Sequence, residues 1–309
     1  MDCEAAIQWD VADPTCPYGY NPLTHVKSEL RPLVVSGLID MLKKQWADAW
    51  GARMEHLLRY ALLALLERPS STLQDIMPMF FDKSFRTRVL AQVKDQQVRL
   101  FWTTEFPKMN YKSAADGVAP IANKLGAFLS HPLVRTAVCQ PEFPIRFRQV
   151  MDDGKILIVN LAKGRLGSDT ANILGGMIVS NIINAAYSRQ TIIEQQRQPF
   201  FLYVDEFHSF TTSAFADALS ELRKYRLGLI LAHQHTNQLD ADIFEAIMGN
   251  VGNLFSFRLG ATDAPKLAKQ FASDAPQPRD LVNLANFEFF AKLMVSGTQT
   301  KAFTGKTLK

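Results

Sequence analysis

Apolar and polar positions in the second half of the chain, from Gly154 onward, follow two alternating periods. Residues 155–161 (KILIVNL) form a nearly continuous apolar run, which is typical of a strand buried on both faces. Residues 168–190 then have the spacing of an amphipathic helix. Strands that alternate with helices predict an α/β fold with a mostly parallel sheet flanked by helices. The same pattern predicts strands at residues 200–205, 227–232, 254–259 and 288–295, and helices at residues 213–225, 241–248 and 263–271.

The first half of the chain has a different pattern. Residues 7–11 fit one strand, and turn-forming residues fill residues 13–22 (DPTCPYGYNP). Residues 32–137 are helical in pattern almost throughout, because apolar residues recur there at the spacing of a buried helix stripe. We therefore expect residues 31–144 to be a large all-α insertion between two strands of the α/β part. The prolines expected to divide this region into several helices are Pro69, Pro78, Pro107, Pro120 and Pro132.

Composition narrows the class of protein only a little. The 309 residues are 47% hydrophobic and 21% charged, and the net charge of +4 is compatible with nucleic-acid binding without indicating it. Cys3, Cys16 and Cys139 lack the spacing of a metal site and are interpreted as reduced thiols of a cytosolic protein. No signal peptide is visible, and the longest apolar stretches, residues 57–66 and 173–187, are shorter than the ~20 residues that span a bilayer. We therefore expect a soluble chain without a membrane segment.

The segment FFLYVDEF, residues 200–207, carries the clearest chemistry. An apolar strand that ends in Asp205 and Glu206 delivers two carboxylates to the edge where open α/β sheets bind ligands. Asp205 can hold Mg²⁺ through water, and Glu206 can polarise a water that attacks a γ-phosphate. This predicts the Walker B strand of a P-loop-type NTPase. The alternative is that both acids merely end a strand and cap the next helix.

Polar residues also end the next predicted strand. Gln234 follows residues 227–232, where it suits a γ-phosphate sensor or a water-positioning role. His233 and His235 flank it, but neighbouring side chains on a strand point to opposite faces, which argues against a shared metal site.

Two basic features accompany these strands. Arg258 lies on the largely apolar segment FSFRL, where a buried charge needs a partner, so it suits a sheet edge or a trans-acting arginine finger. A solvated or salt-bridged arginine is the alternative. Arg223, Lys224 and Arg226 form a basic cluster that fits phosphate contacts of a nucleotide or DNA equally well as a solvated helix end.

Three consecutive segments carry a family resemblance: FFLYVDEFHSF, ELRKYRLGLILAHQHTNQLD and GNVGNLFSFRLGATDAPKLAKQF. Together with DVADPTCPYGYNPL upstream, they resemble the conjugative coupling ATPases of type IV secretion systems, which are TraD/TraG-like proteins related to the HerA and FtsK motors. The resemblance implies a RecA-like fold that binds ATP and Mg²⁺. It implies Asp205 and Glu206 as the Walker B pair, with Asp205 the metal ligand, Gln234 as the sensor and Arg258 as a trans finger. From the basic cluster, Arg223 is the residue that we expect to contact the nucleotide.

The sequence departs from the family in one respect. No Walker A motif, GxxxxGK[ST], occurs, and Gly305-Lys306-Thr307 has no glycine at the required offset before it. In the family this loop lies upstream of where the sequence begins, so we expect an N-terminally truncated ATPase. Its expected parts are residues 1–30, the N-terminal part of the truncated ATPase domain; residues 31–144, the all-α insertion; and residues 145–309, the RecA-like core from Walker B onward.

The function expected from this resemblance is the motor part of a coupling protein that uses ATP hydrolysis to move DNA, or DNA with protein, into a secretion channel. The implied partners are single-stranded DNA, a relaxase or relaxosome, channel components and further copies in a homo-hexamer. The implied location is cytoplasmic, at the inner face of the bacterial membrane. Two alternatives remain open: a non-hydrolysing module that docks substrate or relaxosome, and a HerA/FtsK-type DNA translocase.

Overall fold

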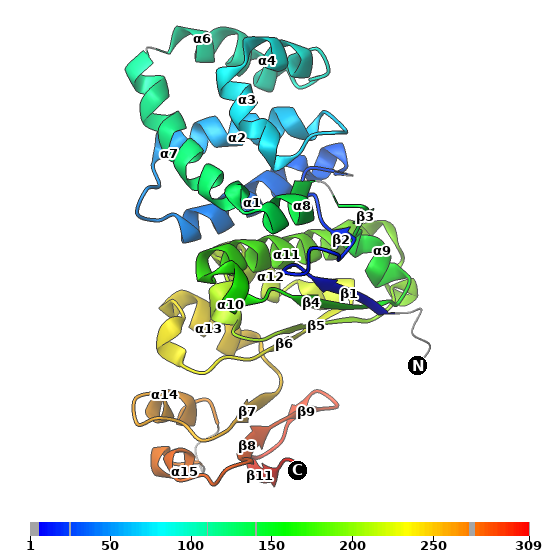
Figure 1. Cartoon of the computed structure of the whole chain (residues 1–309). Coiled ribbons are helices and arrows are strands. Elements are labelled where there is room, and N and C mark those ends of the chain that lie inside the picture. Colours follow the sequence, from blue (N-terminus) through cyan, green and yellow to red (C-terminus); the bar gives the residue numbers. More distant parts are fainter. Residues whose placement is uncertain (1–5, 25, 110, 140, 272–275, 309) are drawn as a thin grey trace. The chain divides into compact units, whose positions relative to one another are not determined.

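The computed structural model describes residues 6–24, 26–109, 111–139, 141–271 and 276–308 (Figure 1). Cys3 lies outside them. The chain forms two compact units. Unit 1 consists of Met1–Val204 and Ser209–Ile230, and unit 2 consists of Asp205–His208 and Leu231–Lys309.

Unit 1 is built on short parallel strand pairs. Strand β1 (Ala6–Asp10) pairs in parallel with β4 (Ile156–Asn160), and the Asn160 amide donates to the Asp10 carboxylate at 3.1 Å. The strands are 150 residues apart in sequence, so the chain leaves this pair and returns to it. The strands predicted at residues 7–11 and 155–161 are therefore confirmed, and the structure shows that they are neighbours. The other pairs are β2 (Tyr18–Gly19) with β3 (Phe143–Pro144), which is parallel, and β5 (Phe200–Val204) with β6 (Leu227–Leu231).

The chain between β2 and β3 is helical, as predicted for residues 31–144, and runs from blue to green in Figure 1. Pro120 does not divide it as expected: it lies inside helix α7. The helix tolerates a missing hydrogen bond there because Ile121 and Leu125 next to it are buried in the core. The helices are α1 (Arg31–Gln45), α2 (Ala52–Leu66), α3 (Ile76–Phe81), α4 (Lys83–Leu90), α5 (Gln96–Leu100), α6 (Phe106–Lys108), α7 (Tyr111–Ser130), α8 (Pro132–Cys139) and α9 (Phe147–Asp152), with short turns η2 (Ser28–Leu30), η3 (Leu73–Asp75) and the π-helical η4 (Phe101–Glu105).

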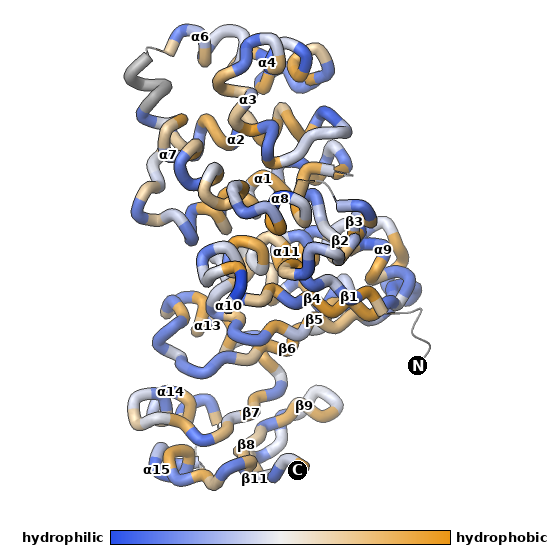
Figure 2. The backbone as a smooth tube through the Cα atoms, viewed as in Figure 1, coloured by the Kyte–Doolittle hydropathy of each residue, from blue (hydrophilic) through white to orange (hydrophobic). Residues whose placement is uncertain are grey.

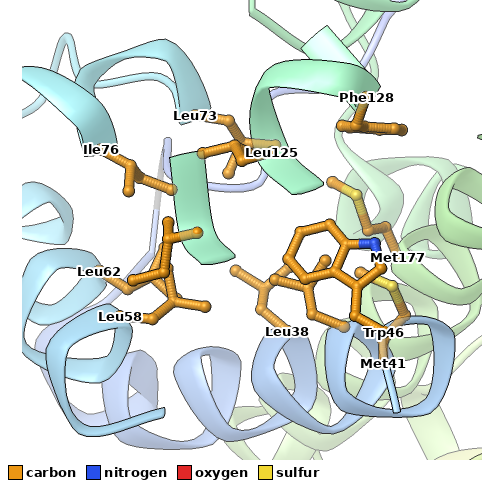
Figure 3. Close-up of a pocket in the computed structure, with 12 residues that line it drawn as sticks. Leu38, Met41, Trp46, Leu58, Leu62, Leu73, Ile76, Leu125, Phe128 and Met177 are labelled. Atoms are coloured by element: carbon orange, nitrogen blue, oxygen red, sulfur yellow. The ribbon is translucent and has the colours of Figure 1, made fainter. Parts of the chain in front are cut away.

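Apolar side chains from several of these helices meet in the core of unit 1. Figure 3 shows Leu38, Leu62, Leu125 and Met177 pointing toward one another, and the void that they leave is about 10 Å³. A void of that size holds about one water, so the core is packed closely. Because α1 packs along α11 (Ser168–Ser188), the helical segment and the α/β strands of unit 1 share one core. The domain division at residues 30 and 144 remains a prediction.

The remaining helices of unit 1 connect the strands, and apolar and polar stretches alternate along them (Figure 2). The predicted helix at residues 213–225 is divided into α12 and the 3-10 turn η8. These elements are α10 (Lys163–Leu166), η5 (Arg189–Thr191), η6 (Glu194–Gln196), α12 (Ser213–Leu219) and η8 (Leu222–Tyr225).

Unit 2 differs from the prediction in its sheet. The predicted final strand is confirmed as β8 (Glu288–Lys292), but it is antiparallel to both of its neighbours, β7 (Leu254–Ser256) and β11 (Phe303–Lys306), whereas a mostly parallel sheet was expected. The chain reaches β11 through a short hairpin, which places successive strands in opposite directions. The other elements are η7 (Phe207–Ser209), η9 (Thr236–Gln238), α13 (Ala241–Asn250), α14 (Ala264–Ala268), α15 (Pro278–Val282), β9 (Met294–Val295) and β10 (Thr298–Gln299).

The segment Gly305-Lys306 lies on a strand. In β11, Gly305 is opposite Phe289 and Lys306 is opposite Glu288, with 3.7 Å between the Lys306 Nζ and Glu288 Oε1 atoms. A phosphate-binding loop needs backbone N–H groups at a helix N-terminus. This segment therefore does not form such a loop.

Within the described parts of the chain, none of the helices combines the length and the apolar character that crossing a bilayer requires.

Candidate functional site

The predicted site residues Asp205 and Glu206 directly follow strand β5. Val204 ends the strand and is buried, whereas Asp205 is exposed. Beyond the strand, the backbone N–H of Phe207 donates to the Ala232 carbonyl at 3.1 Å, so the chain after β5 stays hydrogen-bonded to the chain after β6. This contact brings the ends of both strands to one place, as the sequence pattern predicts for a sheet edge.

Gln234 contacts Glu206. Its Nε2 amide donates to the Glu206 Oε1 atom at 2.6 Å, which is short for an N–H···O bond and typical of a charged acceptor. The predicted pair of a carboxylate on one strand end and an amide on the next therefore exists as a direct contact. One carboxylate oxygen of Glu206 is thereby fixed in direction, as a water-activating base requires.

The backbone of Glu206 is in the left-handed region, with φ 51°. This conformation costs a non-glycine residue about 1–3 kcal/mol, and Ala162, Arg226, Phe287 and Ser296 also have positive φ. The N–H of Glu206 donates to Asp205 Oδ1 at 3.0 Å, which stabilises the sharp turn.

His208 is a site residue that the sequence pattern did not predict. Its Nδ1 atom lies 3.4 Å from Glu206 Oε2, the carboxylate oxygen that Gln234 does not bind. In the sequence, the one feature that could have pointed to His208 is its position two residues after Glu206, on a turn.

The loop that carries Gln234 is also held by contacts with the start of helix α14. Asp263, the N-cap residue of α14, is buried, and its carboxylate accepts a hydrogen bond from the buried Thr236 hydroxyl. His235 Nδ1 lies 3.6 Å from the same carboxylate, and Lys266 Nζ donates to the Asn237 side chain at 2.5 Å. Three consecutive residues after Gln234 are thus tied to α14, which limits the freedom of the amide.

The fit for a magnesium ion rests on Asp205. One of its oxygens accepts from the Glu206 N–H, and the residue as a whole is exposed. Mg²⁺ commonly binds with one or two carboxylates and several waters, so the residues fit that mode. Among the described residues, no group of three or more His, Cys, Asp or Glu side chains could hold a metal by itself. His233 instead lies with its ring 4.9 Å from that of Phe207.

The two predicted arginines lie in different units. Arg258 belongs to unit 2, just beyond the end of β7, where it is exposed and forms no hydrogen bond or ion pair with any described residue. Arg223 is exposed on the turn η8 of unit 1. Within unit 2, the structure does not bring Arg258 into contact with Glu206 or Gln234. The roles of both arginines remain predictions.

Comparison with known proteins gives matches in structure. No protein-family model matches the sequence, and no curated protein matches it significantly. The bacterial conjugative coupling protein TrwBdeltaN70 in complex with sulphate matches with a TM-score of 0.66 and 17% identity, over 97% of this chain and 74% of that chain. The plasmid coupling protein TrwB with the GTP analogue GDPNP matches with a TM-score of 0.68 and 14% identity, over 99% and 74%.

A second kind of protein also matches. VirB4 of Thermoanaerobacter pseudethanolicus has a TM-score of 0.61 and 14% identity, over 98% of this chain and 76% of that chain. These matches run through nearly the whole chain, including the helical segment between β1 and β4. The chain therefore has the α/β, RecA-like fold of the conjugative coupling proteins and VirB4, a fold of the kind found in type IV secretion coupling ATPases.

Proposed function

We propose that this chain provides the hydrolysis half of a nucleoside triphosphatase motor that acts in conjugation or type IV secretion. The observation that carries the proposal is the 2.6 Å hydrogen bond between Gln234 and Glu206 at the ends of neighbouring strands. A helix cap or a simple strand end does not need an amide from another strand to orient its carboxylate. A base that must aim at one water does.

Each residue then has a defined task. Asp205 holds Mg²⁺ through water, Glu206 accepts a proton from the attacking water, and Gln234 orients Glu206 and contacts the γ-phosphate. The fold match supports nucleotide as the ligand, since TrwB itself has been solved with ADP and Mg²⁺ and with a non-hydrolysable ATP analogue. The 309 residues contain no GxxxxGK[ST] loop, so this proposal assigns no residue of the chain to the cradle of the phosphates.

The proposal includes an assembly. We place the chain in a homo-hexameric ring in which Arg258 reaches the site of a neighbouring copy, because its exposed guanidinium, unpaired among the described residues, suits a trans finger. Arg223 adds a phosphate contact. The driven substrate is single-stranded DNA with its relaxase, delivered to secretion channel components at the inner face of the bacterial membrane.

The test is nucleotide turnover by the natural protein that carries this chain, with and without single-stranded DNA. Glu206→Gln removes the base and keeps the shape, and we expect phosphate release to fall at least about 100-fold while nucleotide binding persists. Glu221→Gln is the matched control, because Glu221 is an exposed glutamate whose one ion pair among the described residues is with Lys224 of unit 1. Unchanged turnover in Glu206→Gln would show that this carboxylate is not the base.

Arg258 has its own test by mixing two inactive variants. A 1:1 mixture of Glu206→Gln and Arg258→Ala rings leaves about one quarter of the interfaces with an intact Glu206 facing an intact Arg258, if the arginine acts in trans. We expect turnover to recover to about that fraction. A mixture that stays inactive places Arg258 in the same subunit as the base, or outside the site.

A further inference from the structure

The four residues Asp205–His208 form a turn, the Glu206 turn, whose two flanks both lie in unit 1. The turn begins after Val204, the buried end of β5, and the chain returns to unit 1 at Ser209. Ser209 and Thr211 are buried, with 7% and 2% of their surface exposed. The strand fixes the first flank of the turn. The contacts of residues 209–211 therefore decide how firmly the second flank is held.

The last two residues of α1 donate hydrogen bonds to this second flank. Lys44 Nζ donates to the Thr211 carbonyl at 2.6 Å and lies 3.3 Å from the Thr211 hydroxyl oxygen. Gln45 Nε2 donates to the Ser209 carbonyl in a longer contact of 3.4 Å. A hydrogen bond from an ammonium group is charge-assisted and stronger than one between neutral groups. The half-buried Lys44 thus makes the stronger of the two bonds.

Phe210, between the two residues that α1 holds, packs on α11. A Cβ added at Gly175 of α11 would lie 2.2 Å from the Phe210 Cε1 atom, so the ring rests where the helix has no side chain. Glycine is the residue that allows so close an approach to the backbone. Helices α1 and α11 themselves pack along one another in unit 1 (Figure 1). The second flank is therefore held from two helices of one packed unit.

The strained backbone of Glu206 depends on flanks that do not move. A residue at φ 51° is about 1–3 kcal/mol less stable than in an ordinary conformation, and it keeps that conformation only where the surrounding structure holds it. If residues 209–211 were released, the turn could relax. The Glu206 carboxylate would then move relative to the Gln234 amide, which donates to it at 2.6 Å.

We propose that Lys44 is a positioning residue for hydrolysis. By holding the Thr211 carbonyl, it fixes the end of the Glu206 turn and so the direction of the Glu206 carboxylate. This inference rests on the proposed function, because it takes Glu206 as the base. A helix of the helical segment thus contributes to hydrolysis without touching the reacting atoms.

The experiment is steady-state nucleotide turnover by the natural protein that carries this chain. Lys44→Met keeps the alkyl stem and removes the donor, and we expect kcat to fall about 10-fold while KM changes less than about 2-fold. Lys44→Arg keeps a long cationic donor and should retain at least about half of the wild-type kcat. Lys43→Met is the matched control, because Lys43 is exposed and forms no hydrogen bond or ion pair with a described residue. Its kcat should equal that of the wild type.

Hydrogen exchange measures the hold on the turn without relying on turnover. In Lys44→Met, the backbone amides of residues 205–212 should exchange about 10-fold faster than in Lys43→Met, while those of α2 exchange at the same rate in both. Urea unfolding shows whether each variant is folded. If Lys44→Met does not fold, Lys44→Gln, with a shorter and neutral donor, takes its place in both measurements.

The outcomes separate this proposal from the hydrolysis proposal. A wild-type kcat in Lys44→Met beside an inactive Glu206→Gln would overturn the positioning role and leave Glu206 as the base. A loss of activity that only follows the loss of folded protein, with kcat per folded chain unchanged, would overturn the positioning role too. Turnover that survives Glu206→Gln would instead overturn the hydrolysis proposal, and this inference with it.

Discussion

The buried guanidinium of Arg189 offers a quantitative test of how unit 1 holds its strands. Arg189 follows α11, and its side chain is 0% exposed. Nη1 donates to the Tyr225 carbonyl at 3.0 Å, and Nη2 donates to the Gln198 carbonyl at 2.6 Å. These carbonyls precede β6 and β5 by two residues each, so one side chain ties the starts of both strands to the central helix. Nε lies 3.1 Å from Asp152 Oδ1.

The expected cost of Arg189→Met follows from these contacts. Methionine fills much of the space but leaves two carbonyl groups without their donor, at about 1–3 kcal/mol each. The variant also no longer buries a guanidinium, and burial already lowers the pKa of Arg189, so part of the loss is offset. Asp152 keeps Arg148 as a partner. We therefore expect the free energy of unfolding to fall by about 3 kcal/mol.

Urea unfolding followed by tryptophan fluorescence measures the free energy of unfolding of unit 1. All four tryptophans, Trp9, Trp46, Trp50 and Trp102, belong to unit 1, so the signal reports that unit. A loss of about 3 kcal/mol at a slope of about 2–3 kcal/mol/M lowers the midpoint by about 1–1.5 M.

Arg148→Met is the matched control for Arg189→Met. Arg148 is 30% exposed and shares Asp152, so its removal should cost about 1 kcal/mol or less. If Arg189→Met costs no more than this control, the reasoning about the tied strands is refuted.

Three more predictions concern unit 1. Gly19→Ala should destabilise it by about 1–3 kcal/mol in the same urea assay, because the added Cβ would lie 2.3 Å from the Ala137 carbonyl oxygen. Gly51→Ala is the control, because the space around Gly51 is open. Equal losses of stability in the two variants would contradict the clash at Gly19. Leu62→Ala should cost about 3–5 kcal/mol because Leu62 is 1% exposed in the closely packed core of Figure 3, and a loss under about 1 kcal/mol would mean that the core collapses into the space. Cys139 should react with iodoacetamide at pH 8 much more slowly than the half-buried Cys16, because burial raises the pKa of the Cys139 thiol and leaves less thiolate. Mass spectrometry of the two cysteine peptides measures the labelling, and equal labelling would contradict the protection of Cys139.

The sequence pattern predicted the strands of unit 1 well because their apolar runs are short, continuous and bounded by polar residues. β4, β5 and β6 lie within one or two residues of their expected bounds. The sheet of unit 2 was harder, since strand periodicity does not indicate direction. β11 in particular carries FTGK, whose mixed residues resemble a loop as much as a strand. Its place is set by pairing with β8, which is a long-range contact that no local pattern contains.

The residues of the candidate site also fall into those that the sequence pattern predicted and those that it did not. Asp205, Glu206 and Gln234 could be found because polar residues at the ends of buried strands are conspicuous in sequence. His208 and the brace formed by Thr236 and Asp263 could not, because their roles depend on a turn and on a helix start that meet only in the fold.

The conformation of Glu206 joins these observations into one argument. A glutamate at φ 51° is held against its own preference, so the surrounding contacts must supply what the backbone loses. Three contacts converge there: the Asp205 carboxylate on the N–H of Glu206, the Gln234 amide on one carboxylate oxygen, and His208 near the other. Gln234 in turn belongs to a loop that Asp263 fixes from α14. Glycine or asparagine would adopt this backbone conformation at a lower cost, and the three contacts offset part of that cost for the glutamate on which our proposed function depends.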